Sequence, residues 1–405
     1  MRRRTTWLLG LLTAAGLIAG TTAVPAAAEP EAAPVTTTAT FNDPAGDTAA
    51  QSRIRDHIVD LVGRAPAGST ISVAMYTFTE NPVTDALAAA HARGVRVHVV
   101  LDHTSTTMTG GEYSRLAAAL GTDRTQRSWV YACPAGRGCV GSRKLPNDSD
   151  GAINHNKFLL FSSTGGADKV VVQTSANLTN VQRTGQFNNA VTIVDSGLYD
   201  NYLGYFDDLL AYGSSTGGTD HYYDTPTSAT GPYKTYFFPR RESRWTSYAN
   251  DASTDTVKLI LDNVGCEGGA TQVRVAANLF TRDEVAAKLV ELHEAGCAVH
   301  LAYDGGPGAM GSAVRNVLAG GLTSQAACYE RQDNGSYVRL HSKYLIVEGT
   351  YYGKTGRKLV FTGSHNYTYP ALRANDETLL KIDDAALYDR YRANHEHLMS
   401  YCADA

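Results

Sequence analysis

The pattern of apolar and polar positions near the start of the chain predicts a strand, a helix and a second strand. Residues 71–78 and 95–101 are mostly apolar runs of strand length. Between them, apolar residues recur every three or four positions, as on the buried face of a helix: Val83, Leu87 and Ala90. Gly94 follows, where a left-handed helix cap is favoured.

The same order of elements returns in the second half of the chain. Residues 273–280 and 298–303 predict strands, and Gly296 occupies the place of Gly94. The helix between these strands has its apolar face at Val285, Leu289 and Leu292. Strand, helix and strand in succession imply a right-handed crossover and parallel strands covered by helices. We therefore predict an α/β fold of two copies of one unit, with mixed or parallel sheets.

Each copy also carries a histidine, a lysine two residues later before an apolar strand, and an asparagine after the next strand. These residues are His155, Lys157 and Asn177 in the first copy and His341, Lys343 and Asn366 in the second. A spacing of two along a strand places the histidine and the lysine on one face. A single histidine beside an apolar strand is usually structural, but two copies of the trio predict one site built by both halves.

The first 28 residues have the composition of a secretory signal peptide: three arginines, a long apolar stretch, and alanines at 26–28. We expect an exported, soluble chain that begins near Glu29, because no other apolar run approaches the roughly 20 residues of a membrane-spanning helix. The predicted organisation is a signal peptide (1–28), a flexible segment (29–44), a first half (45–212), a linker and lead-in segment (213–253) and a second half (254–405).

The segment between the halves has two parts. The first is rich in Gly, Ser, Thr and Pro, which favours a linker. The second mixes arginines with four aromatic residues, Tyr233, Tyr236, Phe237 and Phe238. Aromatic residues that alternate with polar ones are ordinary strand material, so we favour a first strand of the second half over a substrate groove.

Six cysteines fit an oxidising compartment. Cys133 and Cys139 are close enough in sequence for a small disulfide loop. Spacing leaves the other pairing open, and our expectation joins Cys297 to Cys328 and Cys266 to Cys402. A zinc site is the competing hypothesis, but no CxxC or Cys/His spacing supports it.

The overall charge narrows the range of partners. A formal net charge of -4 gives no global basic field, which argues against a protein specialised in gripping polynucleotides, although local basic patches remain compatible. Hydrophobic residues make up 43% of the 405 positions, enough for one large core or two fused ones.

The paired HxK and SxN motifs resemble the signature of the phospholipase D superfamily, HxKxxxxD followed by GSxN, twice over. The resemblance covers nearly the whole mature chain, and residues 71–102 are similar to the opening strand, helix and strand of small bacterial members. It implies a duplicated phospholipase D-like fold. In this fold two sheets with outer helices are related by a pseudo-twofold axis, and both motifs meet at the interface.

The resemblance also implies the chemistry. One histidine attacks phosphorus to form a phosphohistidine, and the other protonates the leaving oxygen and then activates water. By analogy His155 is the nucleophile and His341 the acid and base, while the reverse stays open because Glu377 could make His341 the better nucleophile. The phosphoryl oxygens are held by Lys157, Lys343, Asn177 and Asn366, so no metal or other cofactor is required. Ser175 and Ser364 contact phosphate or support the strand ends.

The chain departs from the signature at its acids. The motif aspartate is replaced by Ser162 in the first copy and by Glu348 in the second. The downstream acid of the second copy is Glu377, and Ala190 is expected at the corresponding position of the first copy. A carboxylate that accepts the far N–H of an imidazole fixes its tautomer and raises its basicity. The losses admit a weak enzyme, although the tyrosyl-DNA phosphodiesterase branch also lacks the motif acids.

The expected function is that of a secreted, metal-independent phospholipase D, which hydrolyses phospholipids to phosphatidate and free headgroup. The many tyrosines suit a lipid interface, and contact with a membrane surface should be transient because no anchor helix is evident. The alternatives are a secreted endonuclease acting on nucleic acid, and a catalytically weak binder of phosphorylated ligands. A monomer is expected because one chain carries both motifs.

Overall fold

The structure is a computed structural model that describes residues 1, 5–6, 33–146, 151–215, 217–220, 222, 229–243 and 251–403. The predicted signal peptide lies almost entirely outside the described residues. Both predicted halves belong to one compact unit that begins at Pro34. No helix in the described ranges has the length and apolar character needed to cross a bilayer.

Two mixed sheets form the unit. In the described residues the first sheet has seven strands, in the order β1 (Thr38–Phe41), β8 (Asn189–Val194), β6 (Ala167–Thr174), β5 (Lys157–Thr164), β2 (Thr70–Met75), β3 (Arg96–Leu101) and β4 (Trp129–Ala132). The second sheet runs β7 (Gln186–Phe187), β15 (Tyr337–Leu340), β14 (Ser324–Arg331), β13 (Ala298–Asp304), β12 (Gln272–Ala277), β16 (Tyr344–Tyr351), β17 (Lys354–Gly363), β18 (Thr378–Ile382), β10 (Tyr233–Phe237) and β9 (Ala229–Thr230), with β11 (Val264–Gly265) beside β16.

Seven strand positions of the two sheets correspond. The order β1-β8-β6-β5-β2-β3-β4 in the first sheet matches β10-β18-β17-β16-β12-β13-β14 in the second. Within these seven positions, the last three strands are parallel to one another, as in β2 with β3 and β12 with β13, and the other pairs are antiparallel, as in β2 with β5 and β12 with β16. This repetition confirms the predicted duplicated α/β fold.

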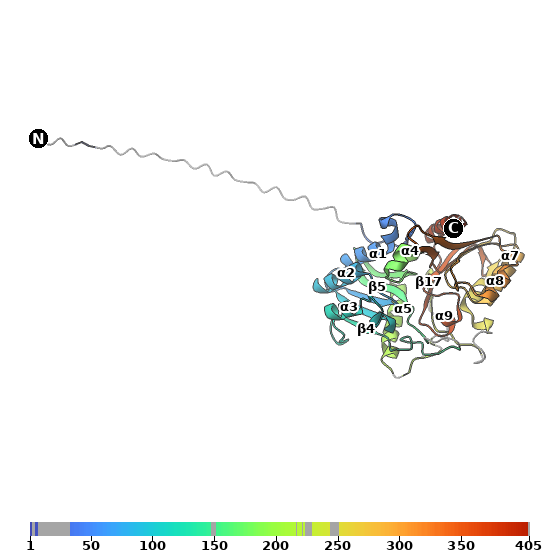
Figure 1. Cartoon of the computed structure of the whole chain (residues 1–405), viewed down its shortest axis with the longest axis horizontal. Helices are drawn as coiled ribbons and strands as arrows, with labels where there is room; N and C mark the ends of the chain where they lie inside the picture. The colour runs from blue at the N-terminus through green and yellow to red at the C-terminus, as the bar shows by residue number, and fades with distance from the viewer. Residues whose placement is uncertain are drawn as a thin grey trace. The chain divides into compact units, whose positions relative to one another are not determined.

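Helices cover the outer faces of the sheets and fill the space between them. They are α1 (Thr48–Gly63), α2 (Asn81–Ala92), α3 (Tyr113–Leu120), α4 (Asn180–Gly185), α5 (Ser196–Gly213), α6 (Thr256–Leu261), α7 (Asp283–Glu294), α8 (Ser312–Leu318), α9 (Tyr369–Arg373) and α10 (Ala385–Ala403), with short 3-10 turns η1 (His103–Thr106) and η3 (Ala252–Thr254). Figure 1 shows α2 and α3 on one side of the unit and α7 and α8 on the opposite side.

The outer helices bury the faces that the sequence predicts. Val83, Leu87 and Ala90 are buried in α2, and the corresponding residues of α7 are also buried. Gly94 and Gly296 follow these helices with φ angles of 101° and 99°, which confirms the left-handed caps.

A shared hydrophobic core joins the halves. One cluster of buried side chains includes Phe158 of β5, Tyr202 of α5, Tyr344 of β16 and Tyr391 of α10. Strands β5 and β16 are therefore covered on both faces, which explains their unbroken apolar runs. The two halves fold against each other as one body, so residues at their junction are held from both sides.

The boundaries between the parts differ from the prediction at two places. Residues 29–44 include β1, which pairs with β8 and places Thr38 opposite Thr192, so this part of the segment is a strand and the expectation of flexibility is wrong there. Its alternating sequence buries Ala39 against the sheet. The lead-in segment forms β10, which pairs with β18 and confirms the preferred strand.

The structure pairs the six cysteines as Cys133–Cys139, Cys266–Cys297 and Cys328–Cys402. The first disulfide confirms the prediction, but the other two contradict it. Cys266 follows β11 and meets Cys297 at the turn from α7 into β13, whereas Cys328 of β14 faces the last turn of α10. Every cysteine lies in a disulfide, so none is free to bind zinc as the competing hypothesis requires.

Candidate active site

The two histidine and lysine pairs lie at the starts of equivalent strands. His155 precedes β5, whose first residue is Lys157, and His341 and Lys343 directly precede β16. Each lysine Nζ donates back to the carbonyl oxygen of its own histidine, at 2.7 Å in the first half and 2.6 Å in the second. The histidines are each 7% exposed and the lysines are buried. The four side chains therefore form a site with little access to solvent.

His155 is held by the second half of the chain. Its backbone N–H donates to the carbonyl oxygen of Asp376 at 3.0 Å. Its Nδ1 lies 2.8 Å from Oε1 of Glu377, a carboxylate that is fully buried. This contact leaves Nε2 of His155 as the ring nitrogen that can attack a substrate.

His341 is held in the same way by the first half. Its backbone N–H donates to the carbonyl oxygen of Phe187 at 2.9 Å, and its Nδ1 lies 2.9 Å from Oδ1 of Asn188. The amide nitrogen of Asn188 donates to the carbonyl oxygens of Gln182 and Gln186, which turns Oδ1 toward the histidine. Because each half holds the histidine of the other, the contacts follow a pseudo-twofold relation.

The structure corrects the assignment of the downstream acids. The backbone N–H of Ser175 donates to the carbonyl oxygen of Asn189, and that of Ser364 donates to the carbonyl oxygen of Thr378. Asn189 and Thr378 therefore occupy equivalent positions. The counterpart of Glu377 is therefore Asn188, and Ala190, which lies two residues further inside β8, was the wrong position. The spacing in the sequence agrees with this register, because Asn188 and Glu377 each lie 11 residues after the motif asparagines Asn177 and Asn366. The contact with His155 also excludes Glu377 as the partner of His341.

The two motif serines belong to the frame of the site. The hydroxyl of Ser175 donates to Oδ1 of Asn188 at 3.0 Å, and that of Ser364 donates to Glu377. Both serines are fully buried. Of the two roles that the sequence left open, these contacts support the structural one.

The positions of the missing motif aspartates lie away from the histidines. The hydroxyl of Ser162 accepts a bond from the backbone N–H of Thr70 at 2.8 Å. Glu348 accepts from the hydroxyl of Tyr388 at 3.0 Å. Neither position contributes a contact to His155 or His341, so their divergence leaves the candidate site intact.

The two motif asparagines are each 7% exposed. Oδ1 of Asn366 accepts from the backbone N–H of Leu279 at 3.4 Å. Oδ1 of Asn177 is buried and has no hydrogen-bond partner among the described residues. A buried acceptor without a partner costs stability, which is typical of a functional site.

Burial dominates the electrostatics of the site. It lowers the pKa of both histidines well below 6.5, and the neighbouring lysines lower it further. Burial also lowers the pKa of Lys157 to about 7, against the opposing effect of Glu377. The pKa of Glu377 is raised by burial to about 8, although Lys157 acts against this. A bound phosphoryl group would favour the cationic forms, so the cluster is suited to an anion.

The pKa of Lys157 leads to a prediction for the pH profile. A lysine carries its charge only below its pKa, so kcat/KM should fall as the pH rises through about 7. Arginine stays protonated throughout this range. We expect Lys157→Arg to lower the maximal rate and to remove the contribution of Lys157 from this alkaline limb, which leaves the limb to Lys343 and His341, whose pKa values are also lowered by burial. An unchanged limb in Lys157→Arg would assign the titration to another group.

A family model described as "Cardiolipin synthase, PLD-like domain" matches residues 63–210 and 268–399. These ranges make up more than half of the chain and contain both sets of motif residues. The chain belongs to the phospholipase D-like family.

Two solved structures share this phospholipase D-like fold at low identity. Phosphatidylserine synthase from Haemophilus influenzae Rd KW20 is 12% identical with a TM-score of 0.58, and the match covers 90% of this chain and 86% of the synthase. Polyphosphate kinase from Porphyromonas gingivalis is also 12% identical, with a TM-score of 0.51 over 90% of this chain, which spans only 50% of the kinase. A search of curated proteins returned no match.

One residue of this phospholipase D-like site had no signal in the sequence. Gln182 of α4 places its Nε2 3.2 Å from Nε2 of His341, while its Oε1 accepts the backbone N–H of Asn177 at 2.5 Å. Five residues after the other motif asparagine, the equivalent position is Ala371. Gln182 therefore caps the reactive nitrogen of one histidine only.

The cap should hold His341 in its neutral form, because a donor to the unprotonated nitrogen disfavours the cation. We expect Gln182→Ala to raise the pKa of His341. The expected effect is about tenfold in the protonation equilibrium, the free energy of one ordinary hydrogen bond. Titration of the ring by nitrogen-15 NMR measures it, with exposed Gln126→Ala as the matched control. An unchanged pKa in Gln182→Ala would contradict the role of the cap.

Two buried aspartates at the ends of parallel strands anchor the segments that lead to the histidines. Oδ2 of Asp102 accepts the backbone N–H of Asn154 at 2.8 Å, one residue before His155. Asp304 forms an ion pair of 2.8 Å with Arg339, two residues before His341. Asp102 and Asp304 lie at the ends of the corresponding strands β3 and β13 in the two copies, and each supports the segment that leads to the histidine of its own half.

A cavity of about 820 Å³ lies near His155, although none of the motif histidines, lysines or asparagines lines it. The ring of Tyr76 in its wall lies 5.2 Å from the ring of His155. The wall includes Tyr76, Asp102, Ile153, Thr281, Tyr369 and Asn375. The space on this side of the site is large enough for a substrate group, whereas the His341 side is capped by Gln182.

Proposed function

We propose that the protein is an exported, metal-independent phosphodiesterase that hydrolyses phospholipids to phosphatidate and free headgroup. The observation that carries the proposal is the asymmetric support of the two histidines. Nδ1 of His155 contacts the carboxyl group of Glu377, whereas Nδ1 of His341 contacts the amide of Asn188 and Nζ of Lys343. A carboxylate makes an imidazole a better nucleophile, while partners without negative charge leave the other imidazole a better acid.

In the proposed first step, Nε2 of His155 forms a bond to phosphorus as the bond to the leaving alcohol breaks. Protonated His341 gives its Nε2 proton to that departing oxygen. In the second step, His341 takes a proton from water, whose oxygen attacks phosphorus and breaks the bond to His155. Both histidines are then restored.

The lysines and asparagines support both steps. Lys157 and Lys343 supply positive charge to the phosphoryl oxygens, and Asn177 and Asn366 supply amide donors beside them. Arrival of the anionic group should raise the depressed pKa of His341, which provides the protonated form that the first step needs.

Lipid is the favoured substrate because the net charge of -4 provides no general attraction for a polyanion. Three disulfides agree with an oxidising compartment, where phospholipids of other cells are accessible. The contacts at Ser162 and Asn188 weaken the alternative of a degenerate binder, since the histidines keep their supports.

The test is turnover of phosphatidylcholine micelles and plasmid DNA in parallel, with excess EDTA. Headgroup release that disappears in both His155→Ala and His341→Ala is the expected result. DNA cleavage with the same dependence, falling steeply with salt, would identify a nuclease instead. A lipid product that carries an added primary alcohol would show that transfer competes with hydrolysis. Failure to turn over either substrate would contradict the proposal.

A further inference from the structure

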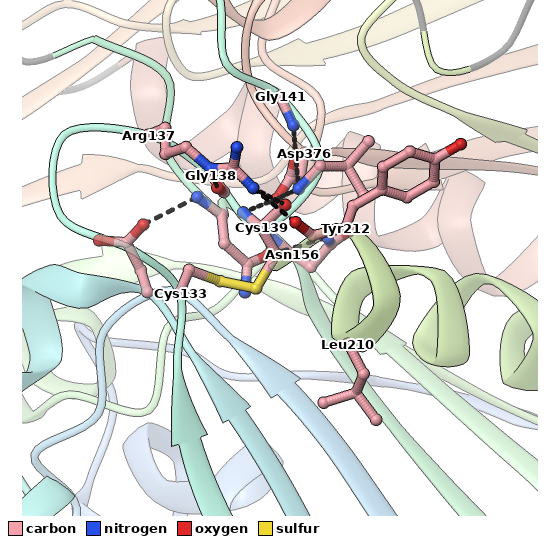
Figure 2. The surroundings of a disulfide bond; sticks show 12 residues. Cys133, Arg137, Gly138, Cys139, Gly141, Asn156, Leu210, Tyr212 and Asp376 are labelled. Atoms are coloured by element: carbon pink, nitrogen blue, oxygen red, sulfur yellow. Dashed lines mark hydrogen bonds between the residues drawn. A yellow bond between two sulfur atoms is a disulfide. The ribbon is translucent and has the colours of Figure 1, made fainter. Parts of the chain in front are cut away.

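Asp376 is a buried carboxylate outside the motifs, and three consecutive backbone N–H groups hold it (Figure 2). Oδ2 accepts from Cys139 at 2.6 Å and from Val140 at 3.1 Å, and Oδ1 accepts from Gly141 at 2.6 Å. The approach is close, because a Cβ at Gly138 would lie 2.7 Å from Oδ2. Burial raises the pKa of Asp376 to about 7, although these donors act to lower it.

The donors come from a loop that is fixed independently of Asp376. The disulfide between Cys133 and Cys139 closes the loop. Arg137 donates to the carbonyl oxygens of Cys139 at 2.9 Å and of Tyr212 in α5 at 2.7 Å, as Figure 2 shows. The three N–H groups are therefore preorganised on the first half of the chain, whereas the carboxylate belongs to the second.

The backbone of Asp376 is tied directly to the segment that carries His155. Its N–H donates to the carbonyl oxygen of Ile153 at 2.9 Å, and its carbonyl oxygen accepts the N–H of His155 at 3.0 Å. The next residue is Glu377, whose carboxylate contacts the imidazole of His155. A shift of Asp376 would therefore displace the histidine and its carboxylate together.

We call this buried carboxylate and the three N–H groups that hold it the clamp. The position near His341 that is equivalent to Asp376 has no such clamp. The residue equivalent to Asp376 is Phe187, whose carbonyl oxygen accepts the N–H of His341. Its ring belongs to the shared apolar cluster and lies 5.0 Å from the ring of Tyr401. The fold thus accepts an apolar side chain at this position. A buried carboxylate is the costlier solution, which suggests that it has a role beyond stability.

We propose that Asp376 is a positioning residue, through which the disulfide-closed loop 133–141 fixes Glu377 and His155 for attack on phosphorus. The catalytic part of this proposal rests on the proposed function. The placement of the imidazole can be measured without any substrate.

The experiment follows the Nδ1 proton of His155 by nitrogen-15 NMR, together with kcat and KM. Two variants disturb the clamp: Asp376→Asn, which turns an amide toward the N–H donors, and Cys133→Ser/Cys139→Ser, which opens the loop. Two controls make the same chemical changes elsewhere in the second half. Asp255→Asn alters a buried carboxylate that caps α6, and Cys266→Ser/Cys297→Ser removes another disulfide.

We expect both clamp variants to lose the slowly exchanging Nδ1 proton signal, while both controls keep it. The kcat of both clamp variants should fall on the order of 100-fold with KM unchanged, as for a misplaced nucleophile. If Asp376→Asn does not fold, the disulfide variant decides alone. A retained signal with unchanged kcat in either folded clamp variant, or equal losses in the controls, would overturn the proposal. Inactivity of the unaltered protein on every substrate would refute the proposed function, and the NMR signal would still test the positioning.

Discussion

The His341→Ala variant should trap a phosphoryl group on His155. Loss of the acid matters little when the leaving group is activated, so a p-nitrophenyl ester of phosphatidate should still react with His155 and release nitrophenolate. The second step needs a base to activate water, and here His341 has no substitute. We expect a burst of about one nitrophenolate per protein molecule, followed by turnover slowed by about 10²-fold to 10⁴-fold.

Mass spectrometry of the quenched variant locates the group. The phosphoryl-lipid adduct should map to His155, and the reciprocal His155→Ala variant should show neither burst nor adduct. His293→Ala, which changes a histidine on the outer helix α7, serves as the matched control and should behave as the unaltered protein does. An adduct on His341 in the His155→Ala variant would reverse the assignment of the two histidines.

The second large effect is expected for Glu377→Gln. Glutamine keeps the shape of the side chain but gives His155 a neutral partner, as Asn188 already does for His341. A carboxylate-to-amide change beside a catalytic histidine costs about 10⁴-fold in the serine protease triad. We expect a loss of about 10³-fold to 10⁴-fold in the rate of the nitrophenolate burst, measured in a single turnover.

The matched control is Glu348→Gln, at the position of the missing signature aspartate. Glu348 contacts the hydroxyl of Tyr388 and no catalytic residue, so the variant should keep the burst rate of the unaltered protein. An equal loss of burst rate in both variants would mean that the loss comes from impaired folding and not from the missing carboxylate. A Glu377→Gln variant with a normal burst would show that the carboxylate does not support the nucleophile.

Much of this site was predictable because its motifs are local. A histidine and a lysine two residues apart must share a strand face, and their repetition identified His155, Lys157, His341 and Lys343 without any knowledge of tertiary contacts. The duplicated fold followed from the matching strand, helix and strand patterns for the same reason. Both signals lie within short stretches of sequence.

The partners of the histidines could not be predicted in the same way. Comparison of the two copies treats each half as complete, whereas the structure joins His155 to Glu377 and His341 to Asn188 across the halves. The Cys266–Cys297 and Cys328–Cys402 disulfides were missed for a related reason, since sequence spacing carries no information on which strand ends meet. Gln182 and Asp376 lie outside every motif, and only their contacts in the structure identify them as part of the site.

The reciprocal contacts also set the moment at which the candidate site is complete. The carboxylate that supports His155 lies 222 residues further along the chain. During synthesis, His155 therefore emerges long before its partner. A growing chain holds an unsupported histidine until almost all of the second half has appeared. Under the proposed function, such a delay would keep the unfinished chain harmless to the phospholipids of the cell that makes it.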